Sequence, residues 1–240
     1  MEYRKALITG SARGIGKAIA LSLANQGFDV AFQYKSSGEE ALQACQQATA
    51  MGGNAIALQA DITQVDQAEM LVETAAEQLG GLSVIVNNMG NYIEKPASAM
   101  SVDEWHHMLD ANLNSTFYVT RTAVPHLKAA NGGRIINFAF ASAHHSLADT
   151  DQTAYRIAKS GIIIYTKSLA KELIQENITA NVISPGVAEN SVGLEETIPL
   201  IPAKRPAKLE DFCNVVKFFV SPEANYITGQ VLEVAGGWRL

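Results

Sequence analysis

The chain has 240 residues, of which 48% are hydrophobic and 18% are charged, and it carries a net charge of −6. This composition indicates a folded globular protein with a large core and excludes a disordered chain. The acidic balance argues against a nucleic-acid partner, which normally binds to a basic face. Two isolated cysteines, Cys45 and Cys213, are too few for a disulfide framework or a zinc site, so we expect reduced thiols and no metal.

The apolar runs of the sequence are short. The longest, in GIIIYT and VVKFFV, fall well below the roughly 20 residues that a membrane-spanning helix needs, so we expect no membrane partner. The first residues run directly into a strand-like segment without an export signal, and we therefore expect a cytoplasmic protein.

Short apolar runs alternate with longer segments of helical period along the whole chain. The predicted strands cover residues 5–10, 29–34, 54–61, 82–90, 133–140, 178–186 and 230–237, and the predicted helices cover residues 14–26, 38–51, 66–79, 102–128, 153–176 and 209–221. This alternation, with strands that are apolar on both faces, predicts a parallel sheet covered by helices on each side. We expect one α/β domain over residues 1–240, a doubly wound sheet of the Rossmann type, with ligands at the carboxyl ends of its strands.

A glycine-rich turn follows the first predicted strand. The sequence TGSARGIG places Gly10, Gly14 and Gly16 in the spacing G-x3-G-x-G at the start of the first predicted helix. Glycine lets the backbone turn sharply and approach a pyrophosphate, which then lies at the positive end of a helix. The turn therefore indicates a nucleotide site, although a tight turn without a ligand would need similar residues.

The end of the second predicted strand indicates which nucleotide is bound. A cofactor with a free ribose 2′-hydroxyl is usually held there by an acidic residue. This strand instead ends in QYKSSG, with Lys35 followed by two serines, and Arg13 adds a cation within the glycine turn. Cations and hydroxyls suit a 2′-phosphate, so we expect NADP(H) rather than NADH. The alternative is that Lys35 and Arg13 are only surface charges.

The segment YRIAKSG carries a candidate acid–base pair. Tyr155 and Lys159 are four residues apart, and so share one face of the predicted helix. A phenol has a reference pKa of about 10, and a nearby ammonium lowers it, which makes the pair a usable general acid. The pattern Y-x3-K is common by chance and means little alone.

The other motifs give this pair its context. The glycine turn, NNMG after the fourth predicted strand, Asn112, the Y-x3-K pair and SPG after the sixth strand occur in an order that resembles the short-chain dehydrogenase/reductase family. The resemblance covers the whole chain, as far as YITGQVLEVAGGW near its end, and is strongest to the 3-oxoacyl-[acyl-carrier-protein] reductases.

The resemblance implies a role for each matching residue. Tyr155 would donate a proton to a substrate carbonyl, Lys159 would bind the nicotinamide ribose and lower the tyrosine pKa, and Asn112 would help to hold a water for proton relay. The implied cofactor-binding positions are Gly10, Arg13, Gly14, Ile15, Gly16, Lys35, Asp61, Asn88, Gly90, Tyr155, Lys159, Pro185, Gly186 and Val187.

The serine that normally follows the fifth strand of the family is out of register here. Counting back from Tyr155 reaches Ser142, whereas counting forward along the strand reaches Phe140, which has no hydroxyl. We favour Ser142 for the role of stabilising charge on the reacting oxygen, with Ser146 as the weaker substitute. The adjacent His144 and His145 are loop residues that could border the substrate.

Three smaller departures concern the cofactor side of the site. Met89 stands where alanine is usual, Asn190 where a threonine commonly meets the carboxamide, and Ala235 where aspartate is common. None of them removes a proton donor. The segment 189–208, rich in proline and glutamate, is the expected substrate lid.

The resemblance also implies a substrate and an assembly. We expect an NADPH-dependent carbonyl reductase for a 3-oxoacyl thioester, either a small molecule or carrier-bound, with Lys128, Lys167 and Lys171 as the candidate docking patch for an acidic carrier. A pteridine reductase-like enzyme and an NADPH-binding sensor or scaffold with weak catalysis are the alternatives. Family members are commonly tetramers, so we expect a homotetramer or homodimer, and the apolar run 162–165 fits such an interface or the core.

Overall fold

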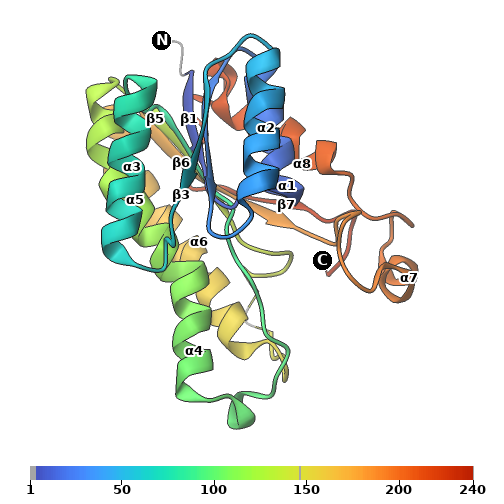
Figure 1. The fold of residues 1–240 in the computed structure, drawn as a ribbon. Coiled ribbons are helices and arrows are strands. Elements are labelled where there is room, and N and C mark those ends of the chain that lie inside the picture. The colour runs from blue at the N-terminus through green and yellow to red at the C-terminus, as the bar shows by residue number, and fades with distance from the viewer. Residues whose placement is uncertain (1–3, 146, 240) are drawn as a thin grey trace.

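The structure is a computed structural model that describes residues 4–145 and 147–239. Within these residues the strands form a seven-stranded parallel sheet in the order β3-β2-β1-β4-β5-β6-β7 (Figure 1). The strands are β1 (Lys5–Ile8), β2 (Asp29–Tyr34), β3 (Ala55–Gln59), β4 (Val84–Asn87), β5 (Gly133–Phe138), β6 (Ile178–Pro185) and β7 (Val231–Val234). The strand order reverses between β1 and β4, which confirms the predicted doubly wound sheet and puts a ligand crevice at that point.

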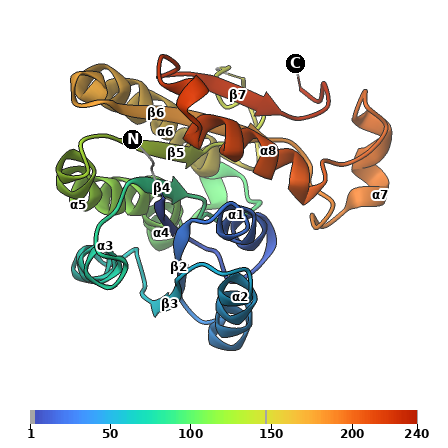
Figure 2. The ribbon, with the colours of Figure 1, turned by 90° about the horizontal axis from the view of Figure 1, so that it is seen from above.

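Helices cover both faces of the sheet (Figure 2). The first layer holds α1 (Gly14–Ala24), α2 (Gly38–Ala50) and α8 (Leu209–Val220), and the second holds α3 (Val65–Leu79), α5 (Ser115–Ala129) and α6 (Thr153–Leu173). Two further helices, α4 (Val102–Leu109) and α7 (Leu194–Thr197), lie beyond the sheet (Figure 1). Across the described part of the chain, no helix has the length and apolar character needed to cross a membrane.

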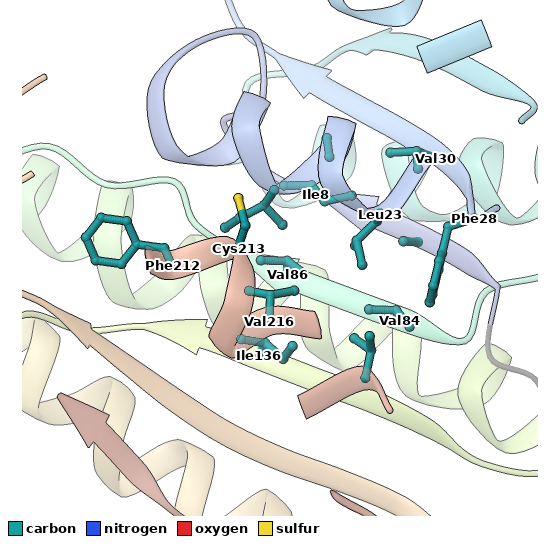
Figure 3. Close-up of a cluster of buried hydrophobic side chains, with 14 of the residues drawn as sticks. Ile8, Leu23, Phe28, Val30, Val84, Val86, Ile136, Phe212, Cys213 and Val216 are labelled. Atoms are coloured by element: carbon teal, nitrogen blue, oxygen red, sulfur yellow. The ribbon is translucent and has the colours of Figure 1, made fainter. Parts of the chain in front are cut away.

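The core between the sheet and the first helix layer fixes the position of the glycine turn. Ile8, Val86 and Ile136 of neighbouring strands pack in one buried cluster with Leu23 of α1 and Val216 of α8 (Figure 3). Each such side chain contributes about 1.5–3 kcal/mol when it leaves water. Because β1 and α1 are both anchored in this cluster, the turn between them is held at both ends.

The long helix predicted over residues 102–128 is interrupted. Ser101 caps α4 by accepting a hydrogen bond from the Glu104 backbone at 3.1 Å, and the helix then widens into a π-helical segment at Asp110–Asn114 before α5 begins. The candidate catalytic residue Asn112 lies in this wide segment. Such π-helical turns occur often at functional sites, and the sequence pattern did not predict this one.

A buried polar network ties β4 and β5 to the helices behind them. Asn87 Nδ2 donates to Asn137 Oδ1 at 2.8 Å and to Thr120 Oγ1 at 2.9 Å, and Asn137 Nδ2 donates to Thr166 Oγ1 at 2.8 Å. These hydrogen bonds connect the carboxyl ends of the two central strands to α5 and α6. Asn87 Oδ1 is buried without a partner among the described residues, so the network is complete on its donor side only.

Candidate active site

The glycine turn requires glycine at each of its three positions. Gly10 and Gly14 have φ of +61° and +56°, values that favour glycine, and a Cβ on Gly16 would lie 2.4 Å from the carbonyl oxygen of Gly10. The turn is therefore folded so tightly that no side chain fits inside it. Asn190, which follows β6, places its Nδ2 2.9 Å from where a Gly14 Cβ would be, so the start of the expected lid reaches the turn.

The turn opens onto a cleft of about 500 Å³. Its lining residues come from the turn, the end of β2, the end of β4 and the start of the expected lid: Gly10, Ala12, Arg13, Gly14, Gln33, Tyr34, Lys35, Ser36, Ser37, Met89 and Asn190. None of these described residues carries a carboxylate. The predicted cations Arg13 and Lys35 both line the cleft, and both are exposed.

Lys35 and Asp61, which were predicted separately, form an ion pair. Their Nζ and Oδ2 atoms are 2.7 Å apart. Burial acts to raise the pKa of Asp61, but hydrogen bonds from Lys35 and Thr63 outweigh it and hold that pKa below its usual value. The carboxylate is therefore ionised and balanced by Lys35, so it presents no unpaired negative charge beside the cleft.

Two other predicted cofactor positions act mainly on the protein itself. Asn88 Nδ2 donates to the carbonyl oxygens of Thr9 and Gly10 at 3.2 Å, which braces the glycine turn from β4. Gly186 lies so close to β7 that a Cβ there would be 2.7 Å from Ala235 Cα. Its neighbours Pro185 and Val187 lie with it at the end of β6, and the half-buried Ile15 packs against the first core cluster.

Tyr155 and Lys159 lie on one face of α6, with the Lys159 Nζ 5.6 Å from the centre of the Tyr155 ring. Lys159 is 3% exposed and donates to the Phe138 carbonyl oxygen at 2.9 Å. Burial lowers the pKa of Lys159 to about 8. Burial, together with the neighbouring Tyr92, raises the pKa of Tyr155 to about 12.

The direction of the Tyr155 shift differs from the expected one. The resemblance implied that Lys159 lowers the tyrosine pKa, but here the ammonium points to the Phe138 carbonyl and the apolar surroundings of the phenol dominate. Tyr155 therefore keeps its proton throughout the neutral range.

Asn112, Lys159 and Gly90 meet at one point. A Cβ on Gly90 would lie 2.6 Å from Asn112 Oδ1 and 3.0 Å from Lys159 Nζ. The Asn112 amide nitrogen donates to the carbonyl oxygens of Met108 and Asn91, both at 2.9 Å, while its buried Oδ1 has no partner among the described residues. The glycine leaves room where these two polar groups converge.

Ser142 and Phe140 occupy different environments. Ser142 is fully buried with φ of +68°, its backbone N–H donates to Glu233 Oε1 at 2.7 Å, and its Oγ has no hydrogen-bond partner among the described residues. The Phe140 ring lies 5.3 Å from the Tyr155 ring, centre to centre. The structure thus brings Phe140, not a serine hydroxyl, into contact with Tyr155, and Ser146 lies outside the described residues.

Two residues of the site were missed by sequence reasoning. Glu233 of β7 pairs with His144 Nδ1 at 3.1 Å and holds the Ser142 backbone, and no motif marks it. Tyr92, in the segment after β4, lies with its ring 5.8 Å from that of Tyr155. An aromatic residue two positions beyond NNMG was the only available signal for it.

Two further predicted features are the substrate lid and Lys128 of the expected docking patch. The segment 189–208 is closed at its base by hydrogen bonds of 2.8 Å between Glu189 N and Ala207 O and between Ala207 N and Val187 O, and α7 within it extends away from the sheet (Figure 1). Lys128 pairs with Glu176 just before β6 begins, at the opposite edge of the sheet from the cleft.

Together, the doubly wound sheet, the glycine turn and the Tyr155–Lys159 pair define a nucleotide-binding oxidoreductase. Residues 10–239 match the family model described as Enoyl-(Acyl carrier protein) reductase. The 3-oxoacyl-[acyl-carrier-protein] reductase FabG of Staphylococcus aureus is 35% identical over 241 residues, covering 98% of this chain and 97% of the relative. The chain belongs to the short-chain dehydrogenase/reductase family.

Solved structures agree with this assignment. A blue fluorescent protein from a metagenomic library, in complex with NADPH, has a TM-score of 0.92 and 32% identity, covering 100% of this chain and 99% of its own. A short-chain dehydrogenase from Burkholderia cenocepacia, in complex with NADP, has a TM-score of 0.92 and 31% identity, covering 98% of each chain.

Proposed function

We propose that this protein is an NADPH-dependent carbonyl reductase that acts on 3-oxoacyl thioesters. The observation that carries the proposal is the convergence of Tyr155, Lys159 and Asn112 beside the glycine-turn cleft. The 35% identity to a 3-oxoacyl-[acyl-carrier-protein] reductase supports the substrate class.

The residues around the cleft fit NADPH. The space that a Gly14 or Gly16 side chain would fill lets the backbone approach a pyrophosphate, and Arg13 and Lys35 offer cations to a 2′-phosphate. Asp61, already paired with Lys35, repels that phosphate less than a free carboxylate would. When bound, NADPH would supply the hydride that adds to the substrate's carbonyl carbon.

The proposed roles of the other residues follow from their protonation states. Tyr155, whose pKa is about 12, holds its proton at neutral pH and gives it to the carbonyl oxygen as charge develops there. Lys159, whose pKa is about 8, is mostly cationic at neutral pH, and we assign it the binding of the nicotinamide ribose rather than a lowering of the Tyr155 pKa. The unpartnered Asn112 Oδ1 is a ready acceptor for a water that returns a proton toward Lys159.

NADPH consumption by the wild type and Tyr155→Phe tests this function. We expect turnover of an acetoacetyl thioester by the wild type and a loss of about 10²- to 10⁴-fold in the variant, with NADPH binding retained. A wild type that binds NADPH but reduces none of an acetoacetyl thioester, a quinone or a dihydropteridine would refute it.

Two observations favour other functions. The enclosed hydroxyl of Ser142 favours an NADPH-binding sensor with little turnover, and binding without reduction of any carbonyl would support that reading. The Phe140 and Tyr92 rings, whose centres lie 5.3 Å and 5.8 Å from that of Tyr155, favour a flat, pteridine-like substrate. Preference for the dihydropteridine over the thioester in the same assay would support it.

We also propose that α6 joins copies of this chain. A groove of about 800 Å³ runs along it, and Leu147, Ile157 and Ile164 are exposed there. Within the run 162–165, Ile162 and Ile163 are buried in the core, so Ile164, at 68% exposed, is the residue available for an interface. Light scattering should give a dimer or tetramer for the wild type and a smaller species for Ile164→Glu; an unchanged mass would refute this interface.

A further inference from the structure

Tyr92 lies beside Tyr155 but is open to solvent. Its ring is 5.8 Å from the Tyr155 ring at an interplanar angle of 53°, and the residue is 55% exposed. After burial, Tyr92 is the second cause of the raised pKa of Tyr155. Tyr92 thus combines contact with the proton donor and exposure to solvent.

The segment that carries Tyr92 is anchored on both sides. The preceding carbonyl, that of Asn91, accepts the hydrogen bond from Asn112 Nδ2 at 2.9 Å, and the Asn91 side chain lies 3.0 Å from His107 Nε2. Further along, the Lys95 backbone N–H donates to the Asp151 carbonyl at 2.7 Å. Tyr92 is therefore held close to Tyr155 by the same asparagine that belongs to the proposed catalytic group.

The reacting oxygen of a carbonyl substrate lacks an evident second donor in this site. Charge that develops on such an oxygen is normally stabilised by more than one hydrogen bond, and loss of one donor costs about 10²- to 10³-fold in rate. Phe140 contacts Tyr155 but has no hydroxyl. Ser142 is fully buried, its Oγ has no hydrogen-bond partner among the described residues, and its backbone N–H donates to Glu233, so in this structure its hydroxyl is not accessible to a substrate.

We propose that Tyr92 supplies the second hydrogen bond to the substrate's carbonyl oxygen, in the role for which Ser142 was the sequence candidate. The inference rests on the proposed carbonyl reductase function. As hydride adds to the carbonyl carbon, the carbon–oxygen π electrons pass to the oxygen, and Tyr155 transfers its proton there. Tyr92 donates a hydrogen bond to the same oxygen and keeps its own proton, so it is a catalytic residue without being the acid.

Removal of a single hydroxyl tests the role. We expect Tyr92→Phe, which keeps the ring, to lower kcat by about 10²- to 10³-fold with KM within about twofold of wild type. Tyr226→Phe is the matched control, because Tyr226 is 99% exposed before β7 and should leave kcat unchanged. Ser142→Ala should cause a smaller loss than Tyr92→Phe.

A rescue experiment separates chemistry from structure. Adding Phe140→Ser to Tyr92→Phe puts a hydroxyl next to Tyr155 from the strand side, and we expect it to restore part of the lost kcat. Phe140→Ser alone, checked by circular dichroism and melting, controls for folding. In the protein without cofactor, phenolate absorbance should titrate at lower pH for Tyr155 in Tyr92→Phe than in wild type, with Tyr155→Phe identifying the signal.

The experiments distinguish failure of the Tyr92 role from failure of the proposed carbonyl reductase function. Unchanged kcat in Tyr92→Phe, or a larger loss in Ser142→Ala, would overturn the role of Tyr92 while an active wild type preserves the proposed function. A wild type that reduces no carbonyl would overturn both, and an unshifted Tyr155 titration would show that the two phenols do not interact.

Discussion

Replacement of Lys159 by methionine should change how stability depends on pH. Lys159 is 3% exposed and its pKa falls from 10.5 to about 8 in the folded protein, because burial disfavours the ammonium. Methionine has a similar length and no charge, so it removes the titration and keeps most of the packing. The variant therefore isolates the free-energy cost of burying the Lys159 ammonium in the folded protein.

The magnitude follows from the difference in pKa. Since the folded pKa lies below the unfolded one, the unfolded chain binds more protons between about pH 8 and pH 10.5, and wild-type stability rises with pH across that window. The shift of about 2.5 units corresponds to about 3 kcal/mol of destabilisation near pH 7, which shrinks to about 1 kcal/mol near pH 10. The lost hydrogen bond to the Phe138 carbonyl costs Lys159→Met about 1–3 kcal/mol, but at every pH alike.

Urea unfolding at fixed protein concentration, from about pH 7 to about pH 10, measures this dependence. The free energy of unfolding of wild type minus that of Lys159→Met should rise by about 2 kcal/mol over the range. Lys167→Met, an exposed lysine on the same helix, is the control and should run parallel to wild type. Parallel curves for wild type and Lys159→Met would refute the reasoning, since they would mean that Lys159 titrates alike in both states.

The remaining predictions concern the site. Reductase activity should fall as pH rises through about 8, where Lys159 loses its proton while Tyr155 keeps its own, and a kcat that is flat from about pH 6 to 10 would contradict this. Lys35→Ala should weaken NADPH binding by about 10-fold and NADH binding by less than about twofold, and equal losses measured by fluorescence titration would mean that Lys35 does not contact a 2′-phosphate. Gly16→Ala should abolish NADPH binding, because the alanine Cβ would lie 2.4 Å from the Gly10 carbonyl oxygen. NADPH binding of wild-type strength would show that the backbone of the turn shifts to accommodate the methyl group.

The sequence predicts the scaffold well because its signals are local. Mainly apolar segments such as β4 and β5 are buried along their whole length, as a parallel sheet requires, and glycines stand where the turn after β1 admits no side chain. The i, i+4 spacing likewise puts Tyr155 and Lys159 on one face of α6. These features depend on neighbouring residues, so periodicity and spacing are enough to find them.

The sequence did not predict the contacts between segments that lie far apart in the chain. The ion pair of Lys35 with Asp61 joins the ends of β2 and β3, and neither segment has a sequence pattern that indicates pairing with the other. The pKa of Tyr155 is a similar case: spacing places Lys159 nearby, but the direction of the shift depends on burial and on Tyr92, which comes from another strand end. The sequence supplied the charges, whereas the packing decided which of them interact.

The register of the serine shows why two valid counts gave different residues. Counting from the strand reaches Phe140 and counting from the helix reaches Ser142, because the loop between β5 and α6 absorbs the difference. In the structure Glu233, 91 residues further along, accepts the Ser142 N–H, and Ser142 has φ of +68°. With Ser142 fixed in that way, Phe140 packs against Tyr155 and the serine hydroxyl is enclosed. With the Ser142 backbone held by this carboxylate on β7 and Phe140 packed against Tyr155, the hydroxyl that we propose to serve the substrate oxygen is that of Tyr92.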